Sequence, residues 1–104
     1  MTTNALEYFE KKLGKLTFGK MLWSLRKCDE ISQTEFAKKL GVSKQYLCDI
    51  EKERTGVSVE KAQEMAKTLG YSEKQFIRLA LQDQLTHAGI KFEIHLEEPY
   101  KNAA

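Results

Sequence analysis

Residues 32–54 read SQTEFAKKLGVSKQYLCDIEKER, and they contain the clearest helix starts and ends of the chain. Ser32 and Glu35 have the spacing of a capping box, in which a serine hydroxyl accepts from the backbone amide three residues later. Apolar residues then recur at helical spacing up to Gly41, a residue typical of a left-handed helix end. Ser43 follows closely and can cap a second helix. We therefore predict two short helices on either side of Gly41, joined too tightly to lie antiparallel.

Serine or threonine residues that can cap a helix N-terminus, and glycines that can end a helix, also occur on both sides of this stretch. They predict further helices over residues 5–13, 18–28, 59–69 and 73–85. The loops between these segments are only a few residues long, which is typical of a compact all-α body with five or six short helices.

The hydrophobic period changes after Gly89. Residues 90–97 read IKFEIHLE, in which four apolar and four polar residues alternate as in a β-strand. A lone strand leaves its backbone groups unpaired, and the sequence offers no second strand, so we expect the partner strand in another chain. The sequence therefore predicts a homodimer with an interface made of Ile90, Phe92, Ile94 and Leu96.

Composition and length are those of one globular domain without a membrane segment. The 104 residues are 41% hydrophobic and 31% charged, which excludes a disordered chain, and no apolar run approaches the length of a membrane helix. No secretory leader is evident, and two cysteines suggest no disulfide framework, so we expect a cytoplasmic protein. The expected organisation is an N-terminal extension or short helix (1–16), a helix-turn-helix domain (17–86), a dimerisation strand (87–97) and a flexible tail (98–104).

The charge balance alone does not identify a nucleic-acid binder. The formal net charge is +2, with a net +3 on residues 1–56 and −1 on the remainder. Any affinity for DNA must therefore come from the local placement of basic side chains.

The stretch quoted above closely resembles the phage-repressor-like Cro/Xre helix-turn-helix family, whose pattern is roughly S-Q-x-x-[LF]-A-x-x-[LG]-G-[VI]-S-x-x-x-[LI]-x-x-[IL]-E-x-x-[RK]. The resemblance covers about Phe18 to Leu81. It implies that the second helix enters a major groove of double-stranded DNA while the first braces it on the backbone. The expected function is a homodimeric, sequence-specific transcriptional regulator of bacterial or phage type, in particular a repressor of a near-palindromic operator.

The resemblance assigns base reading to the exposed side of the second helix, at Lys44, Gln45, Tyr46 and Asp49. The chemistry agrees, because lysine can donate to guanine O6 and N7 and glutamine can bond bidentately to adenine. Asp49 lies one turn beyond Gln45, where it accepts from cytosine N4 or simply repels phosphate. Phosphate contacts are expected from Gln33, Ser43, Lys52, Arg54 and either Lys38 or Lys39.

Two further features follow from the resemblance. Arg26 and Glu51 look like a partly buried ion pair that ties the first helix of the domain to the recognition helix. Many family members carry asparagine or glycine after the position of Glu51, where this chain has Lys52 and Glu53. The carboxylate of Glu53 would lie close to a phosphate, which makes this loop unlike the family's usual one.

Other classes of function find little support in the sequence. There is no nucleophile with a base, no paired carboxylates and no glycine-rich phosphate loop, so we expect no enzymatic activity and no cofactor. His87 and His95 lack the spacing of a zinc site, no metal is expected, and Cys48 is most simply a small helix-filling residue. No small-molecule ligand is expected.

A second hypothesis assigns the protein to another functional class, that of protein-binding antitoxins. Small proteins of this family often serve as antitoxins that neutralise a toxin protein and autoregulate their operon. The strand over residues 90–96 would then extend the edge of a toxin's sheet, or the helix over residues 5–13 would bind the toxin. The two hypotheses are compatible, since such an antitoxin also binds DNA.

Overall fold

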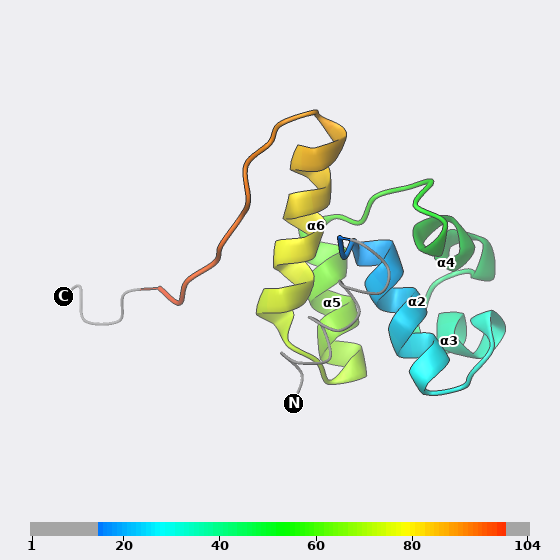
Figure 1. Cartoon of the computed structure of the whole chain (residues 1–104). Helices are drawn as coiled ribbons and strands as arrows, with labels where there is room; N and C mark the ends of the chain where they lie inside the picture. The colour runs from blue at the N-terminus through cyan, green and yellow to red at the C-terminus, as the bar shows by residue number, and fades with distance from the viewer. Residues whose placement is uncertain (1–14, 100–104) are drawn as a thin grey trace.

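The computed structural model describes residues 15–99 and contains five α-helices there (Figure 1). These are α2 (Phe18–Cys28), α3 (Gln33–Leu40), α4 (Lys44–Glu51), α5 (Val59–Leu69) and α6 (Glu73–His87). The helices predicted within this range are thereby confirmed, and the all-α class with them. The helix predicted over residues 5–13 lies outside the described residues. None of the five helices is long and apolar enough to cross a membrane.

Each helix begins at a hydroxyl side chain that satisfies a free backbone amide of the first turn. The capping residues accept from the amide three positions later, and they are Thr17, Ser32, Ser43, Ser58 and Ser72. Gly41 and Gly70 end α3 and α5 in the left-handed conformation, with φ of 73° and 75°. Local sequence therefore sets nearly all helix ends, although α6 continues two residues beyond the predicted Leu85.

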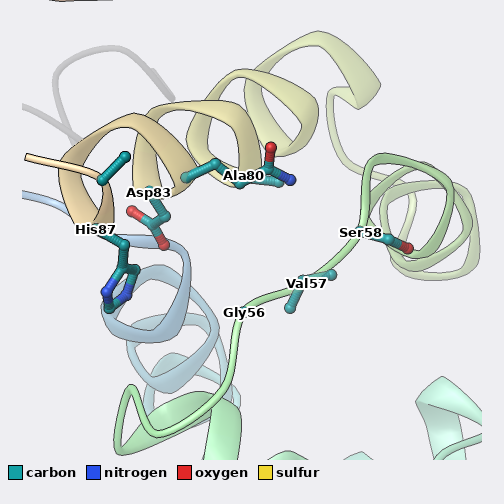
Figure 2. A pocket seen from close by; sticks show the side chains of 8 residues that line it. Gly56, Val57, Ser58, Ala80, Asp83 and His87 are labelled. Atoms are coloured by element: carbon teal, nitrogen blue, oxygen red, sulfur yellow. The ribbon is translucent and has the colours of Figure 1, made fainter. Parts of the chain in front are cut away.

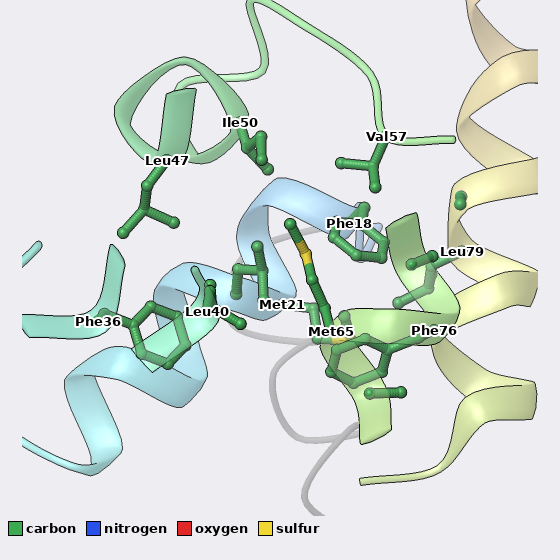
Figure 3. Packing of buried hydrophobic residues seen from close by; sticks show 14 of the residues in the cluster. Phe18, Met21, Phe36, Leu40, Leu47, Ile50, Val57, Met65, Phe76 and Leu79 are labelled. Atoms are coloured by element: carbon green, nitrogen blue, oxygen red, sulfur yellow. The ribbon is translucent and has the colours of Figure 1, made fainter. Parts of the chain in front are cut away.

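The core forms where the apolar faces of all five helices meet (Figure 3). Its largest fully buried side chains are Phe18, Leu22, Phe36, Leu47, Ile50, Met65 and Leu79. Gly19 brings the backbone of α2 directly against the end of α4, because a Cβ atom at this position would overlap the carbonyl oxygen of Ile50. The core thus fixes α4 against α2 through its inner face and leaves the other face to solvent.

The strand predicted over residues 90–96 is not formed, and residues 15–99 contain no strand at all. After Gly89 the chain runs extended along α6 (Figure 1). The alternating pattern is real, but a strand is defined by pairing with a neighbouring strand, which this part of the chain does not supply. The predicted interface residues are accordingly uncovered or half-covered, and Phe92 is 73% exposed.

Candidate nucleic-acid interface

The two helices on either side of Gly41 form a compact helix-turn-helix. Only three residues, Gly41 to Ser43, separate α3 from α4, and each helix has eight residues. Leu47 and Ile50 point from α4 into the core, whereas Lys44 and Gln45 are exposed on its first turn. The beginning of α4 is therefore presented outward by a helix whose other face is buried.

A buried ionic network holds the far end of α4 against the two preceding helices. Arg26 on α2 forms a bidentate pair with Glu51 at 2.8 and 2.9 Å, and the side chains are only 10% and 3% exposed. The side-chain amide of Gln33 donates to the same carboxylate at 2.9 Å. The hydrogen bond with Glu51 raises the pKa of Arg26, which keeps the guanidinium charged. One carboxylate thus joins α2, α3 and α4.

The side chain of Gln33 is consequently directed inward. This side chain was expected to contact a phosphate, but its Nε2 atom donates to Glu51 instead. Gln33 is the first residue of α3, so its backbone N–H lies at a helix N-terminus. This group, and not the side chain, is suited to donate to an anion.

A second, exposed cluster lies on the outer face of α4. Asp49 Oδ1 accepts from Gln45 Nε2 at 3.0 Å and from Arg54 Nε at 3.1 Å. Arg54 also places a guanidinium nitrogen 3.7 Å from the sulfur of Cys48. Asp49 thereby orients one side chain on the first turn of α4 and one in the loop that follows the helix.

The remaining predicted contact residues lie near the ends of α3 and α4. Lys38 and Lys39 are exposed at the end of α3, and Lys52 is exposed at the end of α4. The hydroxyl oxygen of Ser43 accepts from Tyr46 N at 3.0 Å, so this residue acts first as a helix cap. The Tyr46 ring is half-buried and packs against the core, which leaves only part of it on the outer face.

A cleft lies elsewhere on the molecule, between α6 and residues 56–58 (Figure 2). It is an open cleft of about 480 Å³, toward which Asp83 and His87 project from successive turns of α6. The Asp83 carboxylate accepts from Phe18 N at 3.1 Å and so caps α2. Burial raises the pKa of Asp83, and this backbone hydrogen bond opposes the rise. The acidic group of the cleft therefore already has a structural partner.

Comparison with family models finds a match to a helix-turn-helix family over residues 25–76, which is half of the chain. This range contains the tight turn, both eight-residue helices and the buried Arg26–Glu51 pair. The chain belongs to the Cro/C1-type helix-turn-helix family. It is therefore a DNA-binding regulator of that family. Neither the search of curated proteins nor the search of solved structures found a match.

Two features of this helix-turn-helix protein were missed from the sequence. The first is that Asp49 joins Gln45 to Arg54, for which the four-residue spacing of Gln45 and Asp49 was the available signal. The second is Gln82, a polar residue among the apolar positions of α6 that is only 5% exposed. Within residues 15–99, no three potential metal ligands gather into a site.

Proposed function

We propose that this helix-turn-helix protein is a homodimeric, sequence-specific repressor that reads a near-palindromic operator with the first turn of α4. The observation that carries the proposal is the contrast between the two ends of this helix. Its beginning exposes Lys44 and Gln45, whereas its far end is fixed to α2 and α3 through Glu51. A rigidly held helix with a free polar tip suits entry into a major groove.

Base reading is assigned to Lys44, Gln45 and the exposed part of Tyr46. Lys44 donates to guanine O6 and N7, as an exposed ammonium group can. Gln45 uses one amide hydrogen on Asp49, which leaves its other amide hydrogen and its oxygen for a bidentate contact with adenine. Asp49 chiefly positions Gln45, and its second carboxylate oxygen is available to cytosine N4.

Phosphate contacts are assigned to exposed groups of α3, of both ends of α4 and of the loop that follows α4. They are Ser43, Lys52, Arg54, Lys38 and the N-terminus of α3 at Gln33. Arg54 is 55% exposed and already oriented by Asp49, which favours a defined contact with one phosphate. With a net charge of only +2, non-specific binding should be weak and should fall steeply as salt is added.

The homodimer is assigned to the extended segment after α6. This segment lies on the opposite side of α6 from α4 (Figure 1), so pairing through it leaves both recognition helices uncovered. Two such helices read half-sites about 34 Å apart, which is one turn of DNA.

The test is to select the fragments of the source genome that the purified full-length chain retains. The expected result is one enriched motif with two inverted half-sites whose centres lie about 10 base pairs apart. Enrichment that follows no motif would contradict sequence-specific reading, and a motif without inverted symmetry would contradict the dimeric operator.

A further inference from the structure

Gln82 uses its buried side-chain amide to hold the extended segment after α6. Its Nε2 atom donates to Phe92 O at 2.9 Å, and its Oε1 atom accepts from Ile94 N at 2.8 Å. A carbonyl and an amide two residues apart on one edge are the groups that a neighbouring strand would bond. The side chain of Gln82 thus takes the place of a strand residue on the inner edge of the segment.

This contact determines which backbone groups face outward. In an extended chain, the N–H and C=O groups of successive residues point to opposite edges. Because the groups of Phe92 and Ile94 face Gln82, those of Lys91, Glu93 and His95 face away from α6. Among residues 15–99 these outward groups have no backbone hydrogen-bond partner. The side chains of Glu93 and His95 lie on one face, with His95 Nε2 3.9 Å from Glu93 Oε2, as the extended geometry requires.

We infer that this outer edge pairs antiparallel with the same edge of a second copy, about a two-fold axis that passes at Ile94. The inference rests on the homodimer of the proposed function and specifies its register. Gln82 determines which residues can pair between the copies, because it holds the even-numbered residues on the inner edge. Only the odd-numbered residues from 91 to 97 then have backbone groups free to form hydrogen bonds with the second copy.

The charge pattern favours the register centred on Ile94 over the registers centred on Glu93 and on Phe92. It places Lys91 opposite Glu97 of the second copy, which are opposite charges, and Glu93 opposite His95 of the second copy, whose imidazole N–H can donate to the carboxylate, each twice by symmetry. Opposite charges across a strand pair stabilise it, and like charges destabilise it. A register centred on Glu93 would instead set Glu93 against its own copy and Lys91 against His95. A register centred on Phe92 pairs Lys91 with Glu93 but sets His95 against Gly89. Fewer residues of the segment then pair, because Gly89 is where the segment begins.

The apolar face of the segment agrees with the same register. Phe92 is 73% exposed, while Ile94 and Leu96 are half-buried. Pairing about Ile94 puts Phe92 beside Leu96 of the second copy and Ile94 beside its own symmetry mate. Both the charged face and the apolar face are thus complementary to themselves, which favours a second copy as the occupant over an unrelated chain.

Cysteine cross-linking tests the register. In a full-length chain with Cys28→Ser and Cys48→Ser, Ile94→Cys should form a disulfide dimer under mild oxidation, whereas Phe92→Cys should form at least tenfold less. Non-reducing electrophoresis and mass spectrometry measure both. Cross-linking through position 92 in preference to 94 would overturn the register.

Charge reversal tests the pairing without relying on a residue at the axis. Lys91→Glu should raise the dissociation constant of the dimer about tenfold in sedimentation equilibrium, since it creates two like-charge pairs. Adding Glu97→Lys should restore the affinity. Adding Glu98→Lys, a neighbouring charge on the other face of the segment, is the matched control and should not. Equal rescue by both changes would overturn the assignment of Glu97.

The role of Gln82 is tested with Gln82→Met, which keeps the length of the side chain and removes both hydrogen bonds. The dimer dissociation constant should rise about tenfold, while the helical circular dichroism spectrum is retained. Unchanged dimerisation would overturn the role assigned to Gln82.

These experiments are made without DNA, so their failure can be told apart from failure of the proposed function. A wild-type chain that is monomeric yet selects an operator overturns the pairing and leaves DNA reading intact. A dimer that is cross-linked through position 94 but selects no operator overturns the proposed DNA reading and leaves the pairing intact. A monomer whose segment is protected only by a co-purifying protein would assign the edge to that protein.

Discussion

Glu53 adopts a left-handed backbone conformation, with φ of 60°, in the loop that follows α4. Residues with a Cβ atom pay about 1–2 kcal/mol for this conformation, whereas glycine does not. Glycine also loses more conformational entropy on folding, which offsets part of that difference. Glu53→Gly should therefore raise the free energy of unfolding by about 0.5–1 kcal/mol, measured by urea denaturation.

The same position bears on DNA affinity, because the carboxylate lies between the phosphate-binding candidates Lys52 and Arg54 in the chain. Glu53→Gln removes the charge and keeps the strained conformation. It should tighten binding to random DNA and leave stability equal or slightly higher, because the repulsion between Glu53 and Asp83 is removed. A glycine variant less stable than the glutamine variant would show that the left-handed conformation costs nothing here.

Asp83 gives the stability of the domain a dependence on pH. Its folded pKa lies above the ordinary value of 3.8, first because of burial and also because Glu53 is near, so the folded chain binds a proton more tightly than the unfolded chain. The stability gained is present below the unfolded pKa and is lost as the pH rises through the folded pKa.

Asp83→Asn should remove this loss, because an amide oxygen can still accept from Phe18 N. At pH 7 the variant should equal or exceed the wild type in stability, by less than about 1 kcal/mol since Asp83 is only half-buried. Urea midpoints of both proteins at pH 4 and pH 7 measure the difference. If the wild type gained more stability than the variant between these pH values, the direction assigned to the pKa would be wrong.

At the level of elements, α4 depends on its neighbours for its position. A helix of eight residues is not stable alone, so its placement comes from buried Leu47 and Ile50 and from the pair of Arg26 with Glu51. Glu51→Gln leaves the buried guanidinium without its counter-charge and should lower the free energy of unfolding by about 3 kcal/mol.

Gln33→Ala is the matched control for this prediction. It removes one hydrogen bond to the same carboxylate and should cost only about 1 kcal/mol. Thermal and urea unfolding of the two variants compare the costs directly. Equal losses would mean that the ion pair with Arg26 contributes no more than the neutral hydrogen bond.

The helices could be predicted from sequence because each end is encoded locally. Ser43 caps α4 and Gly41 ends α3 through contacts that span only a few residues. The strand could not be settled in this way, since a strand requires a partner and the inner edge of this segment is bonded by Gln82 instead. A glutamine side chain can replace a neighbouring strand, and nothing in the alternating pattern of residues 90–97 indicates that it does.

The positions of the candidate site residues in the fold could be predicted to a similar extent. Exposure of Lys44 and Gln45 follows from the helical period, because the buried positions Leu47 and Ile50 lie on the other face. The inward direction of Gln33 depends on a carboxylate 18 residues away on another helix. Such a contact is set by the packing of the helices, which local sequence does not specify.

The two regions to which the proposal assigns DNA reading and dimerisation lie on opposite sides of α6. The helix-turn-helix lies on one side, and the extended segment after Gly89 lies on the other (Figure 1). The segment therefore leaves α4 uncovered, and changes in one region should leave the other region folded. DNA reading and the proposed dimerisation can therefore be tested with variants of different regions.

Base reading by the first turn of α4, as proposed, is tested by the affinities of three variants for the selected operator and for random DNA. Lys44→Ala and Gln45→Ala should each weaken operator binding by about 1–3 kcal/mol and leave binding to random DNA nearly unchanged. Arg54→Ala should weaken both by similar amounts, because phosphate contacts carry no sequence information. Equal losses on both DNAs for Lys44→Ala and Gln45→Ala would contradict base reading by α4.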